Sequence, residues 1–338
     1  MKILIIRNDK LGDFVLSFPV YQLLKAAMPE SQLHALVPDY TSSLAKAYPH
    51  IDKVIIDSKP EATLAQHYEL LKILRVEKYD AIITLFSTNR IGLLTSLAGA
   101  NYRLAPATKL AQIFYKHKLT QRRSKSLKPE FEYNLDLARK FLSDFKVKSD
   151  FAIEYPVMQF NENDVSEIRS HFCQRHKFSP DNKFIFIHCG TGGSATNLNT
   201  GQYVELIKQL NTSTKLNFVI TAGPGEEESA HKISEELINI PHIVYHSTDG
   251  LVHFSKMIQF CNLFISASTG PLHIAGALNR PTAAFYQRRR SATSLRWQTL
   301  NTEDKRLAFT PPVDMDESDL HNIDVKNAAN EIIKKILS

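Results

Sequence analysis

The sequence has few of the features that mark exported, membrane-spanning or disulfide-stabilised proteins. Its 338 residues include only three cysteines, Cys173, Cys189 and Cys261, which form no Cys-x-x-Cys pair. They predict neither a disulfide framework nor a zinc site. The first apolar run, at 3–6, is too short for a signal peptide or a membrane span. The sequence therefore favours a cytoplasmic protein.

Two common nucleotide-binding patterns are also missing. The sequence has no Gly-x-Gly-x-x-Gly with a ribose-binding acid at the usual distance, and no Gly-x-x-x-x-Gly-Lys-Ser/Thr. Nicotinamide-dependent enzymes and P-loop NTPases are thus disfavoured. The Asp-Met-Asp-Glu at 314–317 mimics a metal-binding Asp-x-Asp, but its polar surroundings favour a solvated loop. We expect no metal and no cofactor.

Composition and charge describe a globular chain with one basic stretch. Hydrophobic residues make up 43% and charged residues 22%, and the length suggests two domains. The net charge of +6 is unevenly spread. Six cations without an intervening acid form what we call the basic segment: Lys116, Lys118, Arg122, Arg123, Lys125 and Lys128. It predicts an anionic partner or membrane surface, or alternatively a solvated loop. We expect no nucleic-acid partner.

Short apolar runs alternate with helix-like patterns in both halves of the chain, which is typical of parallel α/β sheets. The predicted strands are 2–6, 33–37, 53–56 and 81–86, then 183–188, 216–221, 242–246, 262–267 and 282–286. Between about 105 and 180 no regular alternation is visible. We predict domains at 1–170 and 171–315, followed by a C-terminal helix in 316–338.

The first predicted strand ends in Arg-Asn-Asp-Lys-Leu-Gly-Asp-Phe at 7–14. This stretch leaves the carboxyl edge of the sheet, where ligands of open α/β sheets bind. Arg7 and Lys10 place positive charge there. Asp13 would lie at the start of a helix, where it is a candidate functional carboxylate. A simple helix N-cap is the alternative role.

Two later turns suit an anion. The loop after the 183–188 strand is rich in glycine, so backbone N–H groups could approach a phosphate, although an ordinary tight turn is the alternative. The stretch Ser-Thr-Gly-Pro-Leu-His at 268–273 has the signals of a helix start, which presents free N–H groups and a positive dipole. For His273, a structural role is the alternative to a functional one. The residues concerned are Thr191, Gly192, Gly193, Ser194, Ser268, Thr269, Gly270 and His273.

An acidic turn, Glu226 to Glu228, follows the 216–221 strand. A carboxylate at this place could accept hydrogen bonds from ribose hydroxyls. The alternative is an acidic first turn of a helix, which the dipole favours.

Together these segments resemble glycosyltransferase family 9, which includes the heptosyltransferases of lipopolysaccharide core assembly. The resemblance covers 6–25, 187–207, 222–228 and 268–286, and is loose over 105–180. It implies an α/β fold of GT-B architecture, with two facing Rossmann-like domains, parallel sheets and a cleft between them. The N-terminal domain would bind the acceptor and the C-terminal domain the nucleotide sugar. The last helix would pack back on the N-terminal domain.

The resemblance also implies residue roles in an inverting, metal-independent transfer. A heptose or related sugar would move from a nucleotide-diphosphate donor, expected to be ADP-heptose, to a lipopolysaccharide core or lipid-linked acceptor. Asp13 matches the general base, which takes the acceptor's hydroxyl proton. The two anion-ready turns would hold the diphosphate, and Glu226 would face the ribose. We expect Arg7, Lys10, Arg122 and Arg123 to bind the acceptor, with a possible peripheral contact at the inner membrane.

Two departures from the family pattern affect the donor side. Many members have Lys or Arg where this chain has Thr196, and the heptosyltransferases often have Asp where it has Ser268. A neutral hydroxyl cannot supply the positive charge that a leaving diphosphate needs. Arg288 and the two arginines after it follow a predicted strand and are the best substitutes, unless they form only an exposed loop.

Three alternatives to a heptosyltransferase remain from the sequence. A family member could use another donor or acceptor sugar. A nucleotide-sugar epimerase could use the same scaffold without an acceptor. A saccharide-binding relative could have lost catalysis, which the cation missing at Thr196 favours and the presence of Asp13 opposes.

Overall fold

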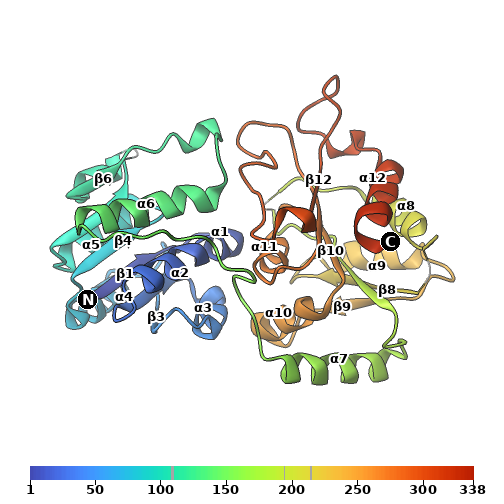
Figure 1. Ribbon diagram of the computed structural model, residues 1–338, viewed down its shortest axis with the longest axis horizontal. Helices are drawn as coiled ribbons and strands as arrows, with labels where there is room; N and C mark the ends of the chain where they lie inside the picture. Colours follow the sequence, from blue (N-terminus) through green and yellow to red (C-terminus); the bar gives the residue numbers. More distant parts are fainter. Residues whose placement is uncertain (108–109, 194, 214) are drawn as a thin grey trace. The chain divides into compact units, whose positions relative to one another are not determined.

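The computed structural model describes residues 1–107, 110–193, 195–213 and 215–338. Ser194 of the glycine-rich loop therefore lies outside the described residues. The chain forms two compact units, Met1–Glu154 and Tyr155–Ser338, and each contains a parallel six-stranded sheet (Figure 1). Among the described residues, every helix is too short or too polar to cross a lipid bilayer.

The first unit has the strand order β3-β2-β1-β4-β5-β6. Its strands are β1 (Lys2–Ile6), β2 (Gln32–Val37), β3 (Lys53–Ile56), β4 (Ala81–Thr84), β5 (Tyr102–Pro106) and β6 (His117–Leu119). Its helices are α1 (Leu11–Val15), α2 (Phe18–Ala27), α3 (Asp39–Ala47), α4 (Leu64–Glu77), α5 (Asn89–Leu97) and α6 (Glu130–Asp144), with 3₁₀ turns at Leu110–Phe114 and Arg123–Lys125. Consecutive residues of β1 point to opposite faces and those from Ile3 to Ile6 are all buried, so both faces of the sheet are covered.

The second unit has the order β12-β11-β10-β7-β8-β9. Its strands are β7 (Lys183–His188), β8 (Leu216–Ala222), β9 (His242–His246), β10 (Leu263–Ala267), β11 (Thr282–Phe285) and β12 (Arg306–Phe309). Its α-helices are α7 (Glu162–His176), α8 (Thr200–Leu210), α9 (Glu227–Glu235), α10 (Gly250–Phe260), α11 (Gly270–Ala277) and α12 (Val325–Ile332). Short turns of helix occupy Glu303–Lys305, Leu320–Asn322 and Ile333–Leu337.

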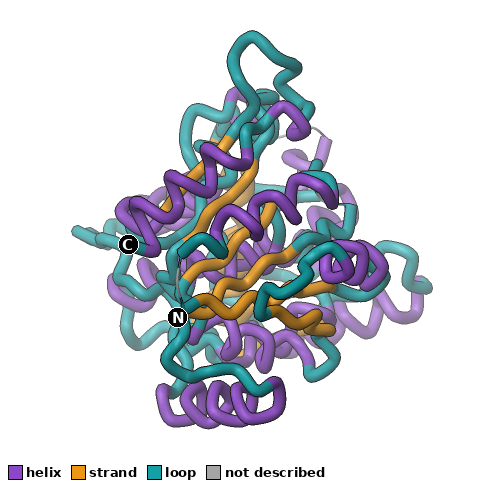
Figure 2. The backbone as a smooth tube through the Cα atoms, turned by 90° about the vertical axis from the view of Figure 1, so that its right-hand side faces the viewer, coloured by secondary structure: helices purple, strands orange, loops and turns teal. Residues whose placement is uncertain are grey.

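Both units have the same topology. Counted within each unit, the strand order is third, second, first, fourth, fifth, sixth, which is the Rossmann order. The order reverses between β1 and β4 in the first unit and between β7 and β10 in the second. In Figure 2 the strands, drawn in orange, lie between helices, drawn in purple. The α/β fold predicted from the alternating pattern is confirmed.

The two units meet in sequence at residue 154, earlier than the predicted boundary at 170. The segment after this point already belongs to the second unit. Met158 N–H donates to Ala277 O at 2.9 Å, and the backbone of Phe160 exchanges two hydrogen bonds with the Gln259 side chain. Helix α7 then packs on α10. These contacts, made across a long sequence separation, are invisible to a pattern of hydrophobicity.

Helix α12 packs on α8 within the second unit. Ala328, Ala329 and Ile332 are buried in the same core cluster as Leu206 and Ile207. The sequence predicts packing on the N-terminal domain, whereas the apolar face of this helix joins the core of the second unit. Its amphipathic pattern identifies the buried face but not the surface that covers it.

Candidate active site

The sequence-predicted motifs follow the strands on either side of the two switch points. In the first unit, Arg7 to Asp13 follow β1. In the second, the glycine-rich loop follows β7 and the 268–273 stretch follows β10. Strands β7 and β10 are paired, with His188 opposite Ser266, so the turns that follow them start side by side. Ligands of this fold bind outside the carboxyl ends of the strands at such a point.

Asp13 lies in the first turn of α1 and bonds to a buried arginine. Arg7 is 2% exposed, and its Nη2 donates to Asp13 Oδ1. Its Nε donates to Asp9 Oδ1 at 2.8 Å, and its Nη1 to Glu130 Oε1 at 3.1 Å. The N-cap residue of α1 is Lys10, so the alternative role of Asp13 as the N-cap is excluded.

Three carboxylates therefore surround the Arg7 guanidinium. Burial alone would lower the pKa of Arg7, but Asp9, Asp13 and Glu130 keep it above its ordinary value. Burial also raises the pKa of Asp13 to about 6, against the opposing effect of Arg7 and with help from the two other carboxylates. A carboxylate with this pKa is ionised at neutral pH and is a stronger base than an exposed aspartate.

Two cations of the basic segment form ion pairs, and the other four are exposed. Arg123 Nη1 donates to Glu130 Oε1 at 2.5 Å, and Lys128 pairs with Asp136. The remaining four are exposed and make no ion pair with the described part of the chain: Lys116, Lys118, Arg122 and Lys125. Lys10 is likewise exposed. Of the predicted acceptor-side residues, the structure thus joins Arg7 and Arg123 to the Asp13 network and leaves Lys10 and Arg122 at the surface.

The glycine-rich loop of the second unit closes on Glu226. Gly192 N–H donates to Glu226 Oε1 at 2.5 Å, and Gly223 N–H donates to Oε2 at 3.0 Å. A Cβ on Gly190 would lie 1.7 Å from this carboxylate, so only glycine allows the approach. Gly192 and Gly193 both have positive φ, which glycine adopts at no cost. The loop does bind a negative group, and here that group is the protein's own carboxylate.

The turn after β10 leaves the start of α11 without a side-chain cap. Thr269 is the N-cap residue, but its hydroxyl pairs with Ser266 Oγ at 2.9 Å. The first N–H groups of α11, from Gly270 onward, remain available to an anion. Ser268 is half-buried at the end of β10. The sequence-predicted helix start is confirmed, with Pro271 in the first turn.

Both histidines near these turns are buried and neutral at pH 7. Burial lowers the pKa of His273 to about 4, and its exposed fraction is only 2%. Burial also lowers the pKa of His188, whose Nδ1 lies 3.0 Å from Thr221 Oγ1. Neither side chain can supply positive charge to a diphosphate. That potential would have to come from helix N-termini or arginines.

Thr196 contacts the residue that precedes Arg288 in the second unit. The Gln287 amide donates to Thr196 Oγ1 and, at 3.2 Å, to Ser318 O. The next residue, Arg288, directs its guanidinium to four backbone carbonyls, those of Pro311, Pro312, Val313 and Met315. Arg288 thus holds the 311–315 segment, which is exposed from Pro312 onward and overlaps the Asp-Met-Asp-Glu stretch.

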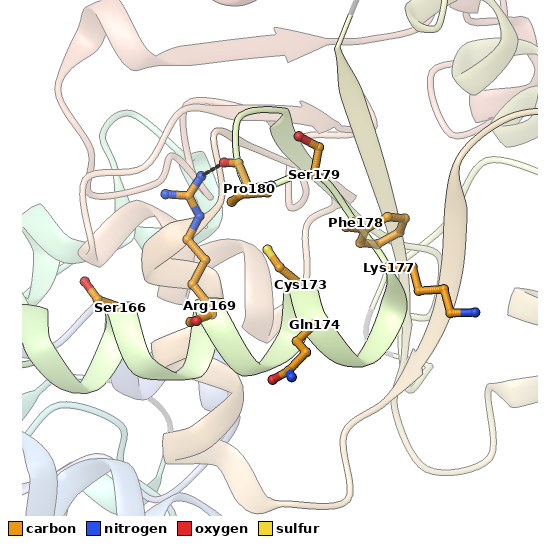
Figure 3. Close-up of a pocket in the computed structure, with 9 residues that line it drawn as sticks. Ser166, Arg169, Cys173, Gln174, Lys177, Phe178, Ser179 and Pro180 are labelled. Carbon is orange, nitrogen blue, oxygen red and sulfur yellow. Dashed lines mark hydrogen bonds between the residues drawn. The ribbon is translucent and has the colours of Figure 1, made fainter.

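A surface hollow beside α7 contains none of the predicted site residues. Its lining includes Arg169, Cys173 and Ser179, and the Arg169 side chain donates to Pro180 O at 2.6 Å (Figure 3). The hollow follows α7 and the turn before β7, so it lies at the amino end of that strand. In this fold, ligands bind at the other edge.

Glu130 and Asn134 are the site residues that the sequence did not reveal. Both are on α6, in the region without readable alternation, and Asn134 Oδ1 accepts from Arg7 Nη1 at 3.1 Å. One feature of the sequence could have indicated Glu130, because it is the first acid after the basic segment. An acid at this position is a candidate ion-pair partner for the preceding cations.

Comparisons with known proteins identify related sequences and structures. A sequence model of glycosyltransferase family 9 (heptosyltransferase) matches residues 67–307. A Haemophilus influenzae protein, named as a glycosyltransferase without a stated donor or acceptor, is 43% identical over 332 residues, covering 98% of this chain and 95% of that protein. Lipopolysaccharide heptosyltransferase 1 of Campylobacter coli is 23% identical over 295 residues, covering 85% and 84%.

The solved structure of Escherichia coli ADP-heptose lipopolysaccharide heptosyltransferase II matches with a TM-score of 0.78. It is 20% identical and covers 100% of this chain and 99% of that one. This likeness confirms the predicted GT-B fold class with two Rossmann-like units.

Proposed function

Because the chain belongs to glycosyltransferase family 9, we propose that it transfers a heptose from ADP-heptose to a saccharide of the lipopolysaccharide core. Membership of the family makes it a glycosyltransferase. The observation that carries the proposed transfer step is the buried Asp13, held by Arg7 at the switch point of the first sheet. The names of the related heptosyltransferases support the choice of donor and acceptor.

In the proposed reaction, Asp13 is the general base. Arg7 engages Oδ1, and in the described residues Oδ2 accepts no hydrogen bond, so it is available to an acceptor hydroxyl. As the acceptor oxygen bonds to the anomeric carbon, its proton passes to Asp13 and the bond to the nucleoside diphosphate breaks. Because the oxygen attacks opposite the leaving group, the configuration inverts. Proton transfer of this kind contributes roughly 10²-fold to 10⁴-fold to a rate.

The second unit would stabilise the leaving diphosphate. The uncapped N–H groups at the start of α11 present positive potential at the carboxyl end of β10. The N–H groups of Gly192 and Gly223 become available only if Glu226 moves from them. A carboxylate released in this way can accept hydrogen bonds from the ribose, which is the role predicted for Glu226 from the sequence.

The acceptor would approach the first unit near the basic segment. The exposed Lys116, Lys118, Arg122 and Lys125 match an acceptor that carries phosphate or carboxylate groups. The same charge would attract the enzyme to an anionic membrane surface, where a lipid-linked acceptor lies.

The test is a donor and acceptor panel with the purified chain. ADP-heptose, ADP-glucose, UDP-glucose and GDP-mannose are each incubated with and without a truncated core acceptor, and products are identified by mass spectrometry. We expect a product one heptose heavier that needs both ADP-heptose and the acceptor. Faster transfer from another donor would replace the proposed donor, and conversion of a donor without acceptor would establish an epimerase.

A further inference from the structure

Glu130 links the basic segment to Asp13 through the buried Arg7. Its Oε1 accepts from Arg7 Nη1 at 3.1 Å and from Arg123 Nη1 at 2.5 Å. The other end of the Arg7 guanidinium contacts Asp13. We propose that Glu130 and Arg123 are positioning residues, which act through the intervening guanidinium on the charge state of Asp13 and in opposite directions. This inference rests on the proposed role of Asp13 as the base.

The side chains of this network are fixed by neutral partners. Glu130 is 1% exposed and lies in the first turn of α6, where the helix dipole favours a carboxylate. Asn134 is completely buried, accepts from Arg7 Nη1 and donates to Leu16 O at 3.1 Å. Gln121 Oε1 accepts from Arg123 Nε at 2.9 Å and from Nη2 at 2.7 Å. A change of charge at one member therefore acts on the others in a defined geometry.

The charges do not balance when Asp13 is ionised. Asp9, Asp13 and Glu130 then carry three negative charges, and the two arginines carry two positive charges. Tyr40 of α3 also faces this group, but burial raises its pKa to about 12, so it stays neutral. An uncharged residue at 130 removes the excess negative charge and favours ionised Asp13. An uncharged residue at 123 increases the excess and favours protonated Asp13.

The experiment measures the pKa of Asp13 directly. The full chain is labelled with ¹³C at the aspartate carboxyl carbons and titrated by NMR, and the Asp13 signal is the one missing from Asp13→Asn. We expect Glu130→Gln, which keeps the hydrogen-bond acceptor, to lower this pKa by about one unit. Arg123→Gln should raise it by about one unit. The double variant restores the original net charge and should titrate close to the unchanged protein.

The matched control is an exposed ion pair on the same helix. Glu132 Oε2 lies 2.9 Å from Arg139 Nη1, and Glu132 is also in the first turn of α6. Glu132→Gln and Arg139→Gln should leave the Asp13 titration unchanged. If Glu130→Gln does not fold, Arg123→Gln still tests the inference, because its side chain is partly exposed. Unmoved titrations, or shifts of the same sign in both network variants, would overturn the inference.

The pH dependence of transfer separates this inference from the proposed function. The acidic limb of kcat/KM should move to lower pH in Glu130→Gln and to higher pH in Arg123→Gln. A purely structural role of Glu130 would lower activity at every pH without moving the limb. If Asp13→Asn transfers sugar at the unchanged rate, the proposed base is wrong while the titration still reports the coupling. If Asp13→Asn is inactive and the titrations stay fixed, only the coupling is wrong.

Discussion

The two units share one strand order but carry different chemistry at the carboxyl ends of the strands beside their switch points. After β1, the chain places a buried cluster of ionised side chains around Arg7. After β7 and β10, it places backbone N–H groups, hydroxyls and the two neutral histidines His188 and His273. The scaffold supplies the position in both units, and the side chains decide the chemistry.

This difference is what we expect if the first unit transfers a proton and the second binds an anion. A base needs a carboxylate whose ionisation is tuned, which requires fixed charges nearby. A diphosphate already carries its charge, so aligned amides and a helix dipole are sufficient to attract it. The comparison predicts that each unit can be impaired without the other.

The largest expected effect comes from removing the base in the first unit. Asp13→Asn keeps the shape and the contact with Arg7 but cannot take a proton. We expect transfer to slow by roughly 10² or more. Binding of ADP, measured by calorimetry, should be unchanged because its predicted site is in the second unit. Turnover at the unchanged rate would remove Asp13 from the mechanism.

The second effect is an opposite pH dependence of stability in the two units. Folding lowers the pKa of His273 to about 4, so the unfolded chain binds its proton first as the pH falls below 6.5. Stability present above pH 6.5 is then lost towards pH 4, by about 3 kcal/mol. Asp13 has a raised pKa, so its contribution is present below pH 3.8 and is lost as the pH rises through about 6.

Urea unfolding at pH 4.5 and 7.5 tests the predicted contribution of His273 to the pH dependence of stability. The single tryptophan, Trp297, is in the second unit and reports on it by fluorescence. The free energy of unfolding of the unchanged protein, minus that of His273→Gln, should be larger at pH 7.5. His321→Gln is the control, because that side chain is 61% exposed. A difference independent of pH would show that folding leaves the pKa of His273 unchanged.

Much of the fold was predictable because strands such as β1, β7 and β10 are short, apolar and buried over nearly their whole length. Apolar runs of this kind identified nine of the twelve strands found in the described residues. Of the missed strands, β6 and β12 are at the edges of their sheets and β5 lies between β4 and β6; they contain Lys118, Arg306 and Arg103. Such strands form because they hydrogen-bond to a neighbouring strand, and a single sequence does not reveal which strands will pair.

For the candidate site, the sequence indicated residues that come soon after a strand. Asp13 and the helix start at 268–273 stood out because they directly follow buried strands. Glu130 did not, because it reaches Arg7 across more than a hundred residues of chain. Glu226 was identified as a candidate, but its position on Gly192 depends on a contact between two loops. Side chains that complete a site from distant elements need the fold itself.

We expect Arg289 to replace the cation that is missing at Thr196. Arg288 is occupied by four carbonyls, whereas Arg289 is exposed and has no ion pair in the described residues. Arg289→Gln should weaken ADP binding about tenfold and leave adenosine binding unchanged, because a charge-assisted bond to phosphate is lost.

Adding Thr196→Lys to that variant should restore part of the affinity. Position 196 already contacts Gln287, two residues before Arg289. Arg288→Gln is expected instead to loosen the 311–315 segment, which limited proteolysis would detect. Equal affinities for ADP and adenosine before and after the changes would show that the second unit binds the nucleoside and not the diphosphate.

The smallest expected effect concerns the exposed cations of the first unit. Arg122→Ser together with Lys125→Ser should raise the KM for an anionic acceptor about fivefold at low salt, because exposed charges contribute little each. The effect should shrink at high salt, and the KM for the donor should not change. Lys128→Ser is the matched control, because that cation is already paired with Asp136. If the double variant has an unchanged acceptor KM at low ionic strength, the basic segment is a solvated loop, and the acceptor's charge is met only by cations closer to Asp13.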